Sequence, residues 1–257
     1  SRNRKAQGVM KNTLKVLSAL LTYPSAELQA AVPEMRSAIE LEGSLPQKCR
    51  LELNHILEEL ATWDLYELQE RYVLLFDRTR SLSLNLFEHV HGESRDRGQA
   101  MVDLKELYER HGLGLASTEL PDYLPLFLEF LSTIPAAEAR ELLAETAHIL
   151  EAIRQRLERR KSPYAAVFLS LQALSRSAPA SDILQALLAA PDDDPNDLEA
   201  LDAAWMEEEV KFGPGAAAEC GTDSLAAKLR AARRPAPGVE QPGDRSSRPV
   251  VTYTPRD

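Results

Sequence analysis

Apolar residues recur every three or four positions along most of the chain, which is the spacing of one face of an α-helix. The first such stripe consists of Leu14, Leu17, Leu20 and Leu21. The helix that carries it is expected to end before Pro24, because the residue preceding a proline disfavours helical backbone. The pattern therefore predicts a first helix that packs on a core through a leucine stripe.

Turn and capping residues divide the remaining pattern into further helices. Ser25 and Asp64 are expected N-caps, because their side chains can accept hydrogen bonds from first-turn N–H groups. No run alternates in the way that a sheet requires. The sequence therefore predicts an all-α bundle of about nine helices. Beyond the first helix, they span about residues 25–41, 47–61, 64–76, 97–111, 118–131, 135–160 (allowing one break), 164–175 and 181–190, with a short turn within 84–89.

Composition divides the 257-residue chain into three parts. Residues 10–212 are predicted to form one helical domain, long enough to bury a sizeable core. Residues 1–9 are predicted to be a flexible N-terminus. Residues 213–257 are rich in Gly, Pro, Ser and Arg and lack core-forming periodicity, so a disordered tail is expected there.

The formal net charge of −10 is concentrated in the helical part. Residues 213–257 hold seven Lys or Arg and five Asp or Glu, which leaves 23 basic and 35 acidic residues in the first 212. A nucleic-acid-binding protein would need a basic face for phosphates, so we exclude that class. An acidic body suits the binding of basic peptides, although solubility alone also explains it.

The cysteines and the N-terminus indicate a cytoplasmic protein. Cys49 and Cys220 are far apart and accompanied by no other thiol, which is typical of a reducing compartment. Lys11 and Lys15 interrupt the apolar N-terminal stretch, so it does not read as a signal peptide. No run approaches the 18–20 apolar residues, roughly, that span a bilayer, and no membrane insertion is expected.

Titratable residues concentrate in the middle of the chain, next to apolar ones. Seven of them fall between positions 88 and 97, directly after Leu84, Leu86 and Phe87: Glu88, His89, His91, Glu93, Arg95, Asp96 and Arg97. A second segment, Glu119–Tyr123, is predicted to open an apolar helix capped by Thr118, with its carboxylates favouring the helix dipole. Such a combination indicates either a solvated loop or a recognition surface.

His89 and His91 raise the question of a metal site. Two histidines that bind one ion from a helix need a spacing of three or four, and these are two apart. No third ligand with clear spacing follows, so we expect no metal and no cofactor, and a hydrogen-bonding role for these side chains. A metal-dependent hydrolase remains the least favoured alternative.

Four stretches resemble a known family. They are FDRTRSLSLNLFEH (76–89), LFEHVHGESRDRGQAMVDL (86–104), ELPDYLPLFLEFLS (119–132) and ALDAAWMEEEVKF (200–212). They are similar to the NarJ-type assembly chaperones of respiratory nitrate reductase, which belong to the all-helical maturation chaperones of molybdenum oxidoreductases. The resemblance covers roughly residues 10–212 and is most specific in the central stretch.

The resemblance implies a chaperone rather than an enzyme. Its partner would be the immature molybdenum-containing catalytic subunit of nitrate reductase, bound through its N-terminal segment during cofactor insertion. A stable structural subunit of the oxidoreductase is the alternative. We expect the loop 78–97 and the segment 119–123 to lie together as a client site, with an apolar groove and a charged rim. The predicted site residues are Tyr72, Phe76, Phe87, Glu88, His89, His91, Arg95, Arg97, Glu119, Asp122 and Tyr123.

Overall fold

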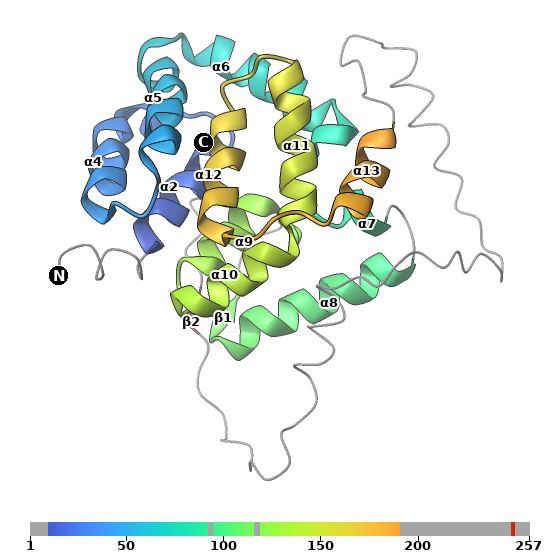
Figure 1. The fold of residues 1–257 in the computed structure, drawn as a ribbon. Helices are drawn as coiled ribbons and strands as arrows, with labels where there is room; N and C mark the ends of the chain where they lie inside the picture. The colour runs from blue at the N-terminus through green and yellow to red at the C-terminus, as the bar shows by residue number, and fades with distance from the viewer. Residues whose placement is uncertain (1–9, 92–94, 116–118, 191–247, 250–257) are drawn as a thin grey trace.

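The computed structural model describes residues 10–91, 95–115, 119–190 and 248–249, and within them the fold is a helical bundle (Figure 1). The N-terminal half contains α2 (Lys11–Leu20), α3 (Ala26–Ala30), α4 (Val32–Glu42), α5 (Gln47–Thr62), α6 (Leu65–Tyr72), a π-helical turn η1 (Val73–Asp77) and a 3-10 turn η2 (Arg80–Leu82). The C-terminal half contains α7 (Glu88–His91), α8 (Arg95–Arg110), α9 (Leu124–Leu131), α10 (Ala136–Glu145), α11 (Ala147–Arg159), α12 (Ala165–Ser175) and α13 (Ser181–Ala189).

The predicted fold class is confirmed, but the number of helices is higher than nine. Twelve α-helices lie in the described residues, partly because two predicted helices are each split in two. Pro33 lies in the first turn of α4 and has no N–H to continue the hydrogen-bond ladder of α3, so the first break falls at Ala31. Thr146 separates α10 from α11, and its hydroxyl donates to the carbonyl of Leu143 at 2.8 Å in place of regular helical bonding.

The predicted N-caps Ser25 and Asp64 are confirmed. The Ser25 hydroxyl accepts from the N–H of Leu28 at 3.2 Å, and the Asp64 carboxylate accepts from the N–H of Tyr66 at 2.9 Å. Helix α4 ends at Gly43, whose φ of +60° is a left-handed conformation that glycine adopts without steric cost. Local sequence chemistry therefore sets these helix ends.

Helix α2 takes its cap from a distant residue. Met10 at its start makes no side-chain capping bond. Instead the Glu42 carboxylate, at the end of α4, accepts from the N–H groups of Asn12 at 2.9 Å and Thr13 at 2.7 Å. A carboxylate is well placed at this positive end of the helix dipole. The pairing ties α2 to α4.

The core lies between α2, α5, α9, α11 and α12, with α2 packed on α9 and α11 packed on α12. The predicted leucine stripe of α2 faces this core, and none of its four leucines is more than 3% exposed. Helix α8 runs along one end of the bundle and α13 lies at its edge beside α11 (Figure 1). No helix in the described part of the chain is long and apolar enough to cross a membrane.

The described residues contain one two-residue pair of strands, which the sequence did not predict. Strand β1 (Leu113–Gly114) pairs in parallel with β2 (Arg248–Pro249). The other residues of the predicted tail lie outside the described ranges, as do residues 1–9 and 191–212. The domain boundary at residue 212 therefore stays a prediction.

Candidate functional site

The two segments that the sequence singled out lie side by side, as expected. The backbone N–H of Leu86 donates to the carbonyl of Asp122 at 3.1 Å, and the N–H of Leu124 donates to the carbonyl of Leu84 at 2.8 Å. An antiparallel bridge between Asn85 and Tyr123 completes the pairing. Backbone bonds therefore join residues 84–86 to residues 122–124, more than 30 positions away in sequence. We call this pairing the junction.

Asp122 fixes this junction from within. Its side chain is fully buried, and its Oδ2 accepts a hydrogen bond of 2.9 Å from the N–H of Phe87. Burial raises the pKa of Asp122 above its ordinary value, while the Phe87 N–H and the charge of Arg97 act in the opposite direction. Its Oδ1 has no hydrogen-bond partner among the described residues. Asp122 is therefore a buried acceptor that anchors the loop.

The predicted helix start in this segment is wrong. Helix α9 begins at Leu124, so Glu119 and Asp122 precede the helix and do not lie in its first turn. Tyr123 occupies the N-cap position with an extended backbone (ψ 116°) and makes no side-chain capping bond. The reason is tertiary, because this backbone is committed to pairing with the preceding loop. The predicted cap, Thr118, lies outside the described residues.

Tyr72, at the end of α6, joins this junction to the bundle. Its hydroxyl donates to the carbonyl of Leu21 at 3.0 Å, so the Tyr123 hydroxyl, 3.2 Å away, acts as donor to Tyr72. The ring of Tyr72 also packs edge-on against Tyr23 and tilted against Phe76, with centroid distances of 5.6 and 5.1 Å. Burial raises the pKa of both hydroxyls, so Tyr72 and Tyr123 remain neutral.

Glu88, His89 and Arg97 in the loop are partly buried and have bonding partners. Arg97 contacts Glu88 at 3.1 Å across α7 and α8. The His89 Nε2 lies 2.8 Å from the carbonyl of Ser83, and it must carry a proton to bond there. Burial lowers the pKa of His89, which keeps the ring neutral. The expected bracing role of this histidine fits these contacts.

The described residues contain no group of three or more His, Cys, Asp or Glu side chains arranged to hold a metal ion. His89, one of the two candidate ligands, is directed to a carbonyl. His91 ends α7 and Arg95 begins α8, but their side chains lie outside the described part of the structure.

A surface hollow of about 300 Å³ opens beside this junction, along α6 and η1. Two tyrosines that line it are accessible to solvent: Tyr66 is 80% exposed and Tyr23 is 50% exposed. Tyr23 also contacts Tyr72, so the hollow adjoins the residues that support the junction. The lining consists of Tyr23, Tyr66, Gln69, Glu70, Val73, Leu74 and Arg78.

Acidic side chains accompany this hollow. Exposed carboxylates lie along the same stretch of α6 and η1, whereas Arg78 is the basic residue in the lining. Glu70 is the acid in the lining, so the preference for a positive ligand depends on the acids around the hollow. The exposed acids are Asp64, Glu67, Glu70 and Asp77.

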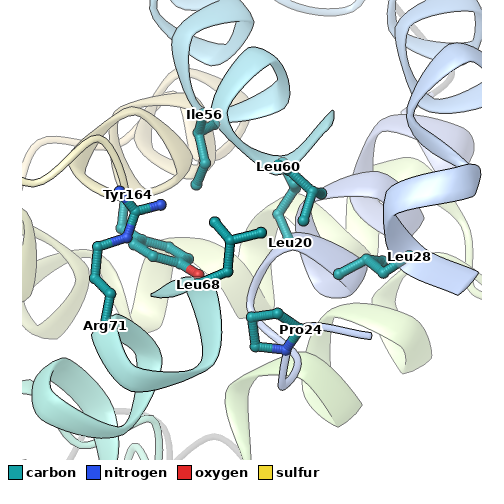
Figure 2. A pocket seen from close by; sticks show the side chains of 8 residues that line it. All are labelled: Leu20, Pro24, Leu28, Ile56, Leu60, Leu68, Arg71 and Tyr164. Carbon is teal, nitrogen blue, oxygen red and sulfur yellow. The ribbon is translucent and has the colours of Figure 1, made fainter. Parts of the chain in front are cut away.

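A second, enclosed cavity lies deeper in the bundle, between α2, α3, α5, α6 and α12 (Figure 2). Its volume of about 10 Å³ is close to the minimum for one water molecule, so it cannot receive a peptide or cofactor. Arg71 borders it, with its guanidinium 4.7 Å from the ring centroid of Trp63 and paired with Glu59 at 2.5 Å. The other lining residues are Leu20, Pro24, Leu28, Ile56, Leu60, Leu68 and Tyr164. This cavity is a packing feature of the core.

The predicted site residues divide into a buried and an accessible group. Tyr72, Phe76, Phe87 and Asp122 are buried, so in this arrangement they support the surface without forming it. The accessible ones are Glu119, which is exposed, and the half-buried Glu88, His89, Arg97 and Tyr123.

The sequence interpretation missed Tyr66 and Tyr23 as surface aromatics. Tyr66 lies off the stripe that Leu68 and Tyr72 form on α6, and its side chain is exposed. An aromatic residue off the buried stripe of a helix is the signal that could have identified it.

Comparison with known proteins places the chain in one family. Residues 25–170 match the nitrate reductase delta subunit family. The chain is 48% identical to the nitrate reductase molybdenum cofactor assembly chaperone NarJ of Escherichia coli K12, over 84% of this chain and 91% of the relative. It is 40% identical to NarW of the same strain, a probable chaperone of the same type, over 82% of this chain and 88% of the relative.

A more distant relative shows the same relationship. The chain is 34% identical to the probable NarJ of Bacillus subtilis 168, over 60% of this chain and 82% of that protein. The family match over residues 25–170 includes the junction and all residues that line the hollow except Tyr23. The chain belongs to the nitrate reductase delta subunit family, whose members include the NarJ-type assembly chaperones.

Proposed function

We propose that this protein is a system-specific chaperone for a nitrate reductase. It binds the immature catalytic subunit, keeps it competent to receive the molybdenum cofactor, and then releases it for assembly. The observation that carries the proposal is the 48% identity to an assembly chaperone along 91% of that relative's length. Like these relatives, the protein acts by binding and is not an enzyme.

The hollow along α6 and η1 supports a peptide-binding role. Tyr66 and Tyr23 offer rigid aromatic surface at its rim, and Val73 and Leu74 add apolar lining. Tyrosine is enriched among the residues that dominate binding energy at protein interfaces. An amphipathic client segment could place an apolar side chain in the hollow, as helices do in other grooves.

The surrounding charge supports a basic segment as the ligand. Carboxylates of Glu70 and Asp77, with other acids of α6, would attract Lys or Arg residues and fix the register of the bound segment. We therefore assign the N-terminal segment of the catalytic subunit to this hollow and to the neighbouring accessible residues Glu88, Glu119 and Tyr123.

We place this activity in the cytoplasm, without insertion into the membrane and without nucleic acid. An acidic protein repels phosphate backbones. Release of the client requires only moderate affinity, which a hollow of this size with few apolar contacts can provide.

The test is titration calorimetry of the full chain with a peptide of the client's N-terminal segment. Replacement of Tyr66 with Ala should weaken binding by about 1–2 kcal/mol, because an exposed aromatic anchor is lost while the core is untouched. Leu41→Ala is the matched control, since Leu41 is 88% exposed and does not line the hollow. Equal affinity of the two variants would place the peptide elsewhere on the protein.

The family description as a subunit gives a reason to keep one alternative, a stable structural subunit of the enzyme. Copurification distinguishes the two. A chaperone associates with the cofactor-free catalytic subunit and is absent from the mature membrane enzyme. Stoichiometric presence in mature enzyme would establish the structural role.

A further inference from the structure

Helix α13 is held to the bundle by less buried surface than its neighbours. It packs on α11 at the edge of the molecule (Figure 1). None of its residues is fully buried, and contact depends on the half-buried Leu184, Leu187 and Leu188. Helix α12, by contrast, buries seven residues. The apolar surface that resists detachment of α13 is therefore small.

A buried arginine of α11 joins α13 to the loop that leads into the candidate site. Arg156 is 2% exposed, and its Nη2 donates to the carbonyl of Leu187 in the last turn of α13 at 2.6 Å. Its Nη1 donates to the carbonyl of Ser81 in η2 at 2.9 Å. Carbonyls in the last turn of a helix lack helical partners, so the guanidinium supplies one. One cation thus connects three elements.

The same stretch of backbone is held by two further side chains. Arg160, the residue that directly follows α11, donates to the hydroxyl of Thr79 at 3.2 Å. His89 contacts the carbonyl of Ser83 at 2.8 Å. Residues 79–83 follow directly on Arg78, which lines the hollow. The position of Arg78 in the lining of the hollow therefore depends on how firmly η2 is held.

Detachment of α13 would disturb this arrangement through Arg156. The buried guanidinium would lose the Leu187 carbonyl, and a buried cation that loses an acceptor must rearrange or become hydrated. Rearrangement would weaken its bond to the Ser81 carbonyl. A looser η2 would then have to be ordered again when a ligand binds next to it, which lowers affinity.

We propose that α13 is a detachable clasp that, through Arg156, holds η2 in the arrangement that binds the client. The inference rests on the proposed function for its ligand, but the coupling of α13 to η2 is a property of the chain alone. Because coupling between two equilibria is reciprocal, client binding should in turn stabilise the docking of α13.

The test uses the full chain with Leu184 and Leu188 both replaced by Asp, which removes two of the three half-buried leucines that hold α13. Its control has Gln185 and Ala189 replaced by Asp, because these two residues of the same helix are exposed. Both variants add the same charge to α13. Differences between them report detachment.

The first measurement is hydrogen exchange at the N–H groups of Leu82 and Ser83, which bond to the carbonyls of Thr79 and Arg80. We expect faster exchange in the detachment variant and unchanged exchange in the control. Equal exchange in both would overturn the clasp, with or without a client.

The second measurement is the affinity for a peptide of the client's N-terminal segment, which should fall by about fivefold or more in the detachment variant only. Unchanged or tighter binding there would also overturn the inference, while binding by the unaltered chain would leave the proposed function intact. If the unaltered chain does not bind the peptide, the peptide-binding proposal fails and the exchange result still decides the clasp.

The route through Arg156 has its own control. In a chain with Arg156→Gln, detachment of α13 should no longer change exchange at Leu82 and Ser83, because the connection is already broken. If detachment of α13 sped up this exchange just as much in the Arg156→Gln chain, Arg156 would not be the connection. If this variant does not fold, the comparison of hydrogen exchange between the detachment variant and its control still decides the clasp.

Discussion

The carboxylate of Asp122 accepts a hydrogen bond of 2.9 Å from the backbone N–H of Phe87, 35 residues earlier in the chain. Both residues are buried, so the bond joins the loop before α7 to the segment before α9 inside the protein. Asp122 is thus a structural residue at the centre of the candidate site, and a substitution there acts on the fold first.

Replacement of Asp122 with Ala should lower the free energy of unfolding by about 1–3 kcal/mol, because the buried Phe87 N–H loses this acceptor. Asp122→Asn retains an oxygen acceptor in a neutral side chain and should cost less. Denaturant unfolding of the two variants measures the difference. Equal stability of Asp122→Ala and the unaltered chain would show that the bond contributes nothing.

Glu119, in contrast, should act on binding and not on folding. Its side chain is exposed, so Glu119→Ala should change stability by no more than about 0.5 kcal/mol. A rim carboxylate mainly steers a basic ligand, so the variant should slow association with the client peptide. Stopped-flow association at two salt concentrations checks this. The difference should shrink at high salt, and an equal association rate at low salt would remove Glu119 from the site.

Tyr72→Phe should cost about 1–2 kcal/mol of stability. It removes the hydroxyl that donates to the Leu21 carbonyl and accepts from Tyr123. Tyr66→Phe is the control, because that side chain is 80% exposed. A double-mutant cycle with Tyr123→Phe isolates the bond between the two hydroxyls, and strict additivity would argue against it.

Glu151 should make stability depend on pH in the acidic range. Burial acts to raise its pKa, but hydrogen bonds from Arg154, Gln155 and Gln172 outweigh this and lower the pKa to about 2 from the ordinary 4.5. The folded state therefore favours the carboxylate. Its contribution, roughly 3 kcal/mol, is present above pH 4.5 and is lost as the pH falls toward 2.

The comparison is between the unaltered chain and Glu151→Gln in denaturant unfolding from pH 7 to pH 2. The stability advantage of the unaltered chain should shrink across that window. Glu141→Gln, at an exposed position of α10, serves as the control. A constant difference at all pH values would contradict the assigned role of the charge.

Local features of the fold could be predicted because their causes are local. Ser25 and Asp64 cap helices through bonds to residues two or three positions away. The leucine stripe of α2 follows from the helical repeat alone. The proximity of the loop 78–97 and the segment 119–123 was expected, and the backbone bonds between them agree with it, while their role as a client site stays a prediction.

The start of α9 and the exposure of individual site residues could not be predicted in this way. The helix begins at Leu124 because the preceding backbone pairs with a loop far away in sequence, which overrides the capping pattern around Glu119 and Asp122. The same pairing buries Asp122 and leaves Glu119 exposed, although both are acidic residues three positions apart.

The sequence by itself determined that this protein is acidic and all-α, because helical periodicity, capping residues and charge are properties of neighbouring residues, and the resemblance of four stretches to a known family indicated its family. Only the tertiary structure decided which aromatic residues reach the surface. Tyr66 and Tyr72 lie six positions apart on α6, yet one is 80% exposed and the other is buried against Leu21 and Tyr123. The hollow between Tyr23 and α6, and the connection from α13 to η2 through Arg156, depend in the same way on contacts between residues distant in sequence. Such contacts form only when the helices pack.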